Sequence, residues 1–193
     1  MNEYLAEFLR LDGNKYMVFN TEKRSRLTRK YSWAVPNDQA IDFIVQHSPI
    51  IEMGAGNGYW ASLVSKAGGK IDAFDKQPYK NDWITHATEN PIKYFTVKKG
   101  SIEKLSLTRY KTWTLFLCWP PYSTSFAFDA LQAYQGNLFI FIGEHEGGCT
   151  GDDDFFSELK KNWKIVKRID IPRWWAIYDE LIAWQRVPLA CKS

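Results

Sequence analysis

The sequence has few cysteines and histidines, and they are poorly placed to bind a metal together. No Cys-x-x-Cys is present, and the histidines do not join the cysteines at metal-ligand spacing. We therefore expect neither a structural zinc site nor a disulfide framework, which fits a reducing compartment. The residues concerned are Cys118, Cys149, Cys191, His47, His86 and His145.

Long apolar runs are also missing. No stretch approaches the ~18 apolar residues that a membrane-spanning helix needs. The N-terminus carries Glu3 and Glu7 among its first residues, which is not the pattern of a signal peptide. These absences predict a cytoplasmic or otherwise intracellular protein without a membrane partner.

Net charge is low as well. A formal net charge of +3 over 193 residues does not by itself indicate a nucleic-acid partner. The basic residues are unevenly spread, however, and one N-terminal segment has only Glu22 to oppose its charges. Such a segment is ordinarily a solvated face, but it would also suit the phosphates of RNA or another nucleic acid. Its basic residues are Lys23, Arg24, Arg26, Arg29 and Lys30.

What the chain does have is aromatic side chains and an alternating pattern of strands and helices. Aromatic residues make up 16% of the sequence, with nine tryptophans, and can serve as core and rim or as stacking surfaces for a planar ligand. The length suits one domain. Strand patterns alternate with helix patterns and predict five parallel strands, followed by an antiparallel hairpin at the sheet edge. The predicted strands are 50–53, 70–74, 94–98, 113–118 and 138–142, with the hairpin at 164–171 and 181–187.

Helices are expected between these strands, over 59–67, over 125–134 and after Asp152. The segment 81–91 is polar and irregular. Residues 1–36 are expected to form an N-terminal helix and a basic extension packed on the core. Residues 37–193 then form the main domain.

The most informative segment runs from Ile50 to Gly58 and reads Ile-Ile-Glu-Met-Gly-Ala-Gly-Asn-Gly. A buried strand that turns through glycines into a helix brings backbone N–H groups close to a nucleotide-like ligand. Asp75, at the end of the second strand, can accept hydrogen bonds from both hydroxyls of a ribose. These features suit NAD and S-adenosylmethionine equally. The dinucleotide fingerprint, however, would need its third glycine at Tyr59, which argues against NAD.

The run Glu-x-Gly-x-Gly-x-Gly resembles the first motif of class I S-adenosylmethionine-dependent methyltransferases. The terminal hairpin is similar to that family's, and the resemblance spans roughly 37–187. It implies a Rossmann-like, mostly parallel seven-stranded sheet with helices on both faces. It also implies that S-adenosylmethionine is the cofactor and that S-adenosylhomocysteine is the product. The implied cofactor-binding residues are Glu52, Gly54, Ala55, Gly56, Gly58, Asp75, Ser101 and Cys118. Ser101 stands where the family commonly has Asp near the adenine.

The loop Cys118-Trp119-Pro120-Pro121-Tyr122 follows the fourth strand. It resembles the Asp/Asn-Pro-Pro-Tyr motif of amino-methyltransferases, in which acceptors of the amine hydrogens make a planar nitrogen more nucleophilic. Here Trp119 replaces the acceptor, and an indole offers only a donor. Either Trp119 stacks on the substrate and another residue accepts the proton, or the substrate is not a planar amine. Glu144 is the candidate acceptor or base, beside Trp119, Pro120 and Tyr122 as predicted catalytic residues.

Two readings of another class stay open. One is a nucleotide- or S-adenosylmethionine-binding module without catalytic activity, which the change at Trp119 suggests. The other is a small NAD-dependent oxidoreductase, which the spacing disfavours. The methyl acceptor can be a nucleobase, a protein amide or a small heterocycle. The glycine-rich segment 144–151 is long enough to cover such a site as a lid.

Overall fold

A computed structural model describes residues 1–11, 17–18, 21–79 and 92–188. The predicted irregular segment 81–91 lies outside them. The α-helices and short 3-10 helices (η) are α1 Glu3–Leu9, α2 Thr21–Lys30, α3 Asp38–Gln46, α4 Tyr59–Lys66, η1 Ile102–Ser106, η2 Thr108–Tyr110, α5 Phe126–Ala133 and α6 Asp153–Asn162. The strands are β1 Met17–Val18, β2 Ile50–Met53, β3 Ile71–Asp75, β4 Val97–Lys99, β5 Thr114–Cys118, β6 Leu138–Gly143, β7 Trp163–Asp170, β8 Arg173–Trp174 and β9 Glu180–Arg186. Within these residues, no helix is both long and apolar enough to cross a bilayer.

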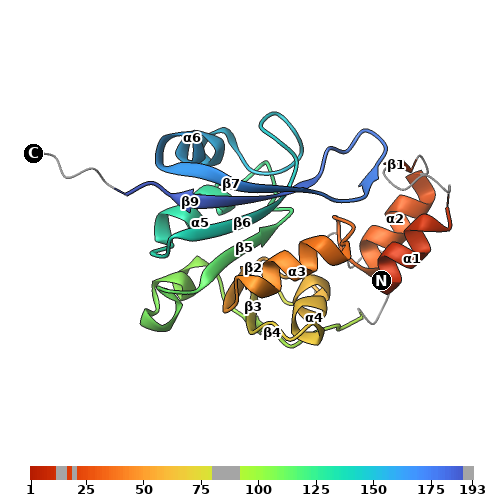
Figure 1. The fold of residues 1–193 in the computed structure, drawn as a ribbon, viewed down its shortest axis with the longest axis horizontal. Helices are drawn as coiled ribbons and strands as arrows, with labels where there is room; N and C mark the ends of the chain where they lie inside the picture. The colour runs from red at the N-terminus through yellow and green to blue at the C-terminus, as the bar shows by residue number, and fades with distance from the viewer. Residues whose placement is uncertain (12–16, 19–20, 80–91, 189–193) are drawn as a thin grey trace, which may run out of the picture.

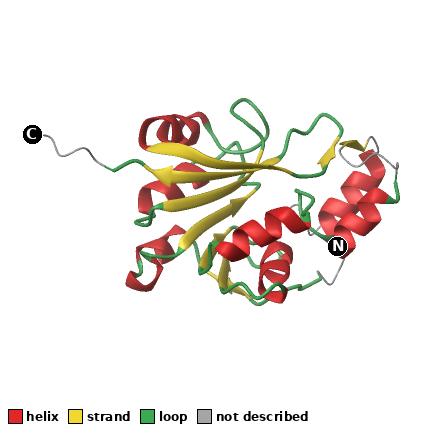
Figure 2. Ribbon diagram, viewed as in Figure 1, coloured by secondary structure: helices red, strands yellow, loops and turns green. Residues whose placement is uncertain are grey.

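Seven strands form one sheet in the order β4-β3-β2-β5-β6-β9-β7. Figure 2 shows in yellow how the sheet twists. The first five are parallel, and β9 pairs antiparallel with both β6 and β7. This arrangement confirms the predicted five parallel strands with a terminal antiparallel hairpin. The chain runs outward from β2 through β3 to β4 and then returns to β5 on the other side of β2. The strand order therefore reverses between β2 and β5, where open α/β sheets bind their ligands.

Alternate residues of the central strands enter two separate cores. Ile50 of β2 packs with α3 and α4, whereas the next residue, Ile51, packs on the opposite face with α5 and α6. On β5, Phe116 lies on the α3 side and Leu115 on the α5 side. A strand buried on both faces needs an apolar residue at almost every position, which explains these near-continuous apolar runs. Helices thus cover both faces of the sheet (Figure 1).

A third apolar cluster joins the N-terminal helices to α4 and to the connection between β7 and β9. Phe8 of α1 and Leu27 of α2 are fully buried beside Trp174 of β8. β1 pairs in parallel with β8, which lies in the connection between β7 and β9. Figure 1 draws α1, α2 and β1 together at one end of the molecule, where the β7–β9 connection reaches them. Segments far apart in the sequence therefore build this region jointly.

Three local details differ from the sequence-based expectation. The third strand begins at Val97 rather than Tyr94, because the Tyr94 N–H donates to the Asn57 carbonyl instead of to a strand neighbour. The basic segment is a regular helix, α2. The expected hairpin turn, 172–180, contains the short strand β8.

Candidate active site

One cavity of about 810 Å³ opens where the strand order reverses. The loop after β2 lines it through Gly54 and Gly56, and the loop after β5 lines it through Trp119. Parallel neighbouring strands end at the same edge of the sheet, so loops 65 residues apart in the sequence meet there. The volume is in the range of small-molecule sites.

The glycine loop is held by backbone conformations that a side chain disfavours. Gly56 has φ 56° and Gly58 has φ 80°, both in the left-handed region. The Gly56 N–H donates to Oδ2 of Asp75 over 2.9 Å, and Oδ1 of Asp75 accepts from Gln77 N–H over 2.8 Å. Asp75 thus lines the cavity and also fixes the loop.

Gly58 is needed for packing. A Cβ built on it would lie 2.8 Å from the Cβ of Phe95. It caps the start of α4 and is absent from the residues that line the cavity. Of the predicted cofactor residues, those that do line it are Glu52, Gly54, Ala55, Gly56, Asp75, Ser101 and Cys118.

Glu52 is the most unusual of these side chains. It is 2% exposed, and its Oε2 has no hydrogen-bond partner among the described residues. Burial, with a smaller contribution from the Asp75 charge, raises the pKa of Glu52 to about 8. A buried carboxyl without a partner is costly in an empty protein. Because Glu52 lines the cavity, this arrangement suits a ligand that brings a hydrogen-bond donor.

The Trp-Pro-Pro-Tyr loop reaches the cavity through Trp119, Pro121 and Tyr122, whereas Pro120 is buried outside the lining. Trp119 adopts φ 55°, and its Nε1–H donates to Oδ1 of Asp179 over 2.8 Å. The indole donor is therefore used inside the protein, and the ring presents a flat wall to the cavity.

Asp179 was not singled out from the sequence. It is 2% exposed, and burial raises its pKa to about 7, although the Trp119 hydrogen bond acts in the opposite direction. A lone Asp in a hairpin connection gives no sequence signal of this role. Only its contact with a residue 60 positions away reveals it.

Glu144, the predicted acceptor or base, follows the last residue of β6. It is 5% exposed and does not line the cavity. One carboxylate oxygen accepts from Cys149 N–H over 2.8 Å, and the other accepts from Tyr178 N–H over 2.9 Å. This pairing gives Glu144 a structural role, in which it joins two loops.

The segment 144–151, expected as a lid, is tied to the Pro-Pro turn. Pro121 and Thr150 form an isolated antiparallel bridge, and Gly151 N–H donates to the Pro120 carbonyl over 3.0 Å. His145 pairs with Glu180 at 2.8 Å. Cys149 is the residue of this segment that lines the cavity.

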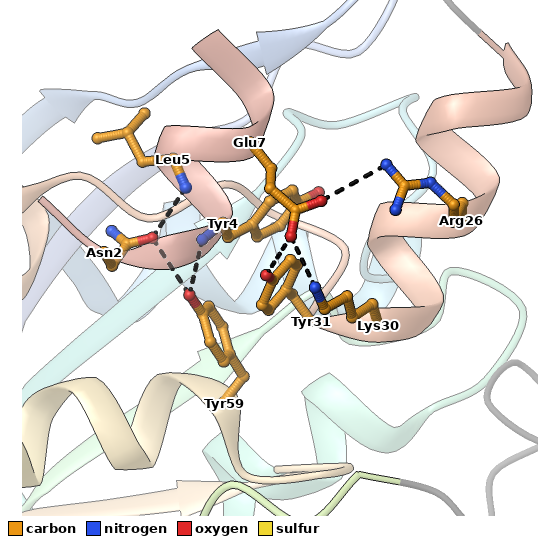
Figure 3. Close-up of polar contacts among 8 residues, drawn as sticks. All are labelled: Asn2, Tyr4, Leu5, Glu7, Arg26, Lys30, Tyr31 and Tyr59. Carbon is orange, nitrogen blue, oxygen red and sulfur yellow. Dashed lines mark hydrogen bonds and ion pairs between the residues drawn. The ribbon is translucent and has the colours of Figure 1, made fainter. Parts of the chain in front are cut away.

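The basic segment divides between two faces of α2. Arg26 and Lys30 point toward Glu7 of α1, with N–O distances of 3.5 and 2.6 Å (Figure 3). Tyr31 also donates to Glu7 over 2.6 Å. Arg24 and Arg29 line the cavity instead.

Figure 3 also shows how this N-terminal unit is fastened to the helix that follows the glycine loop. The Tyr59 hydroxyl of α4 accepts from the Tyr4 N–H over 3.1 Å and donates to Oδ1 of Asn2 over 3.2 Å. Asn2 in turn caps α1 by accepting from the Leu5 N–H. These contacts hold α1 and α2 beside the cavity.

A second aromatic wall comes from the same region. Trp33, just after α2, stacks on Trp119 with ring centroids 4.9 Å apart and planes inclined by 13°. Both rings line the cavity. Sequence reasoning noted the abundance of tryptophan but could not pair these two, because they are 86 positions apart.

Comparison with known proteins supports the fold. No protein-family model matches the chain, and no curated protein matches its sequence. The solved structure of magnesium protoporphyrin IX methyltransferase (ChlM) from Synechocystis, with bound SAM, superposes with a TM-score of 0.55 at 12% identity. The match covers 96% of this chain and 92% of that one.

Two further solved structures agree. The same enzyme with bound SAH gives a TM-score of 0.55 at 11% identity, covering 94% of this chain and 93% of that one. A mutant of MtNAS in complex with S-adenosylmethionine gives 0.53 at 10% identity, covering 78% and 60%. The chain therefore has the Rossmann-like fold of class I methyltransferases, with its cavity where that fold reverses its strand order.

Proposed function

We propose that this protein is an S-adenosylmethionine-dependent methyltransferase that methylates a nitrogen of a planar amino or amide group. One observation carries the proposal. The glycine loop after β2 and the Pro-Pro-Tyr loop after β5 line the same cavity at the reversal of the strand order. The likeness in fold to methyltransferases with bound SAM or SAH supports it.

The cofactor half of the cavity contains suitable groups. Oε2 of Glu52 has no hydrogen-bond partner in the described part of the chain, and Asp75 offers carboxylate oxygens at the end of the neighbouring strand. Gly54 and Gly56 let a ligand approach the backbone. When bound, S-adenosylmethionine supplies a methyl group activated by a positively charged sulfur. The Asp75 carboxylate at this end favours a cationic ligand.

The acceptor half orients a planar group. Trp119 is fixed by Asp179 and by Trp33, so its position is set before a substrate arrives. The Tyr122 side chain, 60% exposed at the cavity mouth, is free to pack on an entering ring. Two successive prolines make the intervening turn rigid. Holding a flat acceptor in one orientation is the main contribution that such walls make to methyl transfer.

The first test is calorimetric titration with S-adenosylmethionine, S-adenosylhomocysteine and NAD. We expect both sulfur compounds to bind and NAD to bind more weakly. Tighter binding of NAD would contradict the proposal and favour an oxidoreductase. Absence of any binding by the sulfur compounds would also contradict it.

The second test follows transfer of a labelled methyl group to a panel of amino-aromatic acids, nucleosides and peptide amides. Trp119→Ala should leave S-adenosylhomocysteine affinity unchanged and lower turnover. Unchanged turnover would show that Trp119 is only a structural wall. Cofactor binding without transfer to any member would instead indicate a non-catalytic module.

A further inference from the structure

Helix α2 presents one regular face to the cavity. Its lining residues follow helical spacing at i, i+3, i+4, i+7 and i+8, which places them on a single stripe. The stripe consists of Thr21, Arg24, Ser25, Thr28 and Arg29. The helix therefore forms a polar, basic wall of the cavity, and none of these five residues is acidic.

The basic side chains on the two sides of α2 differ in whether they form ion pairs. Arg26 and Lys30 both pair with Glu7. Among the described residues, neither Arg24 nor Arg29 makes an ion pair with a carboxylate. The Nε of Arg24 is buried without a hydrogen-bond partner there. Burial of an unsatisfied guanidinium nitrogen is unfavourable, so this side of the wall is suited to an anionic ligand.

The aromatic wall adjoins these arginines. The guanidinium of Arg24 lies 5.7 Å from the centroid of the Trp33 ring, and Trp33 stacks on Trp119. A ligand that packs on this wall thus has a cationic group beside it. The carboxyl groups that line the cavity, Glu52 and Asp75, belong to strands β2 and β3, at the cofactor end. At the other end the buried Asp179 accepts from Trp119 and interacts electrostatically with Arg24, but it does not line the cavity. The side chains that line the cavity are therefore acidic at one end and basic at the other.

We infer that the methyl acceptor is a small planar molecule carrying a carboxylate or phosphate group, and that Arg24 and Arg29 bind this group. The inference rests on the proposed function, since it assigns the acceptor half of the same cavity. Arg24 and Arg29 are the specificity-determining residues. The paired Arg26 and Lys30 play no part in it, which separates this site from a continuous phosphate-binding surface along α2.

The test compares matched acidic and neutral probes by calorimetry on the full chain. Anthranilate is compared with anthranilamide, and AMP with adenosine, so that the two pairs separate a carboxylate from a phosphate as the bound group. We expect the acid of at least one pair to bind about tenfold more tightly than its neutral partner, the effect of one charge-assisted hydrogen bond. No preference in either pair, including no binding of either acid, overturns the inference.

Variants locate the effect. Arg24→Gln and Arg29→Gln should each remove most of the preference for the acid. Arg26→Gln, on the same helix with the same change of charge but outside the cavity, should keep it. Thermal melting of each variant shows whether it is folded, and because Arg29 is exposed its substitution carries little risk to folding. Equal losses in all three variants would overturn the assignment to the inner stripe.

A further set of titrations separates failure of the proposed function from failure of the anion site. The titrations are run with and without saturating S-adenosylhomocysteine. If S-adenosylhomocysteine does not bind but the acid preference persists and depends on Arg24, the proposed function fails and the anion site stands. If S-adenosylhomocysteine binds and the preference for the acid is absent, the anion site fails and the proposed function stands. A single-stranded RNA oligonucleotide that binds and loses equal affinity in Arg24→Gln and Arg26→Gln would favour a polymer and overturn the small acceptor.

Discussion

The two halves of the cavity are built in different ways. The proposed cofactor half centres on the backbone of the glycine loop, at Gly54 and Gly56, with the Asp75 side chain from the next strand. The proposed acceptor half consists of side chains from distant segments, including Arg24, Trp33 and Trp119. A backbone-built half is specified by a short motif. A half built from side chains can change its ligand through single substitutions without altering the fold.

The largest expected effect is a loss of cofactor affinity caused by a substitution in the glycine loop. Gly56→Val places a β-branched residue at φ 56° and moves the N–H that donates to Asp75. We expect S-adenosylhomocysteine affinity to fall by at least about 100-fold, since strain of 1–3 kcal/mol adds to steric exclusion of the ligand. Calorimetry measures the loss.

The matched control is Gly68→Val. Gly68 has φ 92°, and a Cβ there meets nothing within 4 Å. It carries the same kind of backbone strain but does not line the cavity. It should lower the melting temperature and leave ligand affinity intact. Equal loss of affinity in both variants would mean that the effect on binding is only general destabilisation.

The second prediction contrasts two buried glutamates. Glu144→Ala leaves the N–H groups of Cys149 and Tyr178 without their acceptor, so we expect a loss of about 2–4 kcal/mol in unfolding free energy. For a chain of this length that is a fall of roughly 5–15 °C in melting temperature. Chemical denaturation measures it, and unchanged ligand affinity would confirm that Glu144 does not face the substrate.

Glu52→Gln should raise the free energy of unfolding, whereas Glu144→Ala lowers it. The pKa of Glu52 is about 8 in the folded protein, above its ordinary value of 4.5, so ionisation opposes folding. Its contribution to stability is fully present below pH 4.5 and is lost as the pH rises to about 8. The variant should therefore gain stability relative to the native protein across this window, while its ligand affinity falls. A variant less stable at pH 8 than the native protein would contradict this account.

The smallest expected effect concerns the acceptor wall. Trp119→Phe keeps an aromatic ring but removes the donor to Asp179, at a cost of about 1–3 kcal/mol. That hydrogen bond lowers the pKa of Asp179, which burial has already raised to about 7, so its loss raises the pKa further. The destabilisation should therefore be larger at pH 8 than at pH 5, because only ionised Asp179 misses its donor fully. Denaturation at the two pH values measures this, and a pH-independent loss would show that the ring's packing dominates.

The sheet could be predicted from the sequence because it depends on local patterns, and the glycine loop was recognisable for the same reason. The residues of β2 other than Glu52 are apolar because the strand is buried on both faces, and the glycines after it mark the turn that follows. The parallel order predicts the loop after β5 beside that turn, and Trp119 of this loop lines the same cavity as the glycine loop.

The acceptor half depended on contacts that leave no local signal. The pattern of α2 shows many charges, but which of them are neutralised depends on Glu7, and thus on how α1 packs. Glu144 follows a strand that ends at the site, yet its side chain turns to the N–H groups of other loops. The role of Asp179, which is to accept the hydrogen bond from Trp119, depends on a contact that the sequence does not reveal.

The pairing of β1 with β8 has a consequence for how the protein is made. α1 and α2 are translated long before β8 and the Trp174 side chain on which they pack. These two helices therefore lack part of their packing surface until β8 has left the ribosome. The cavity wall that α2 forms is fixed in place only after strands β2 to β7 have been translated.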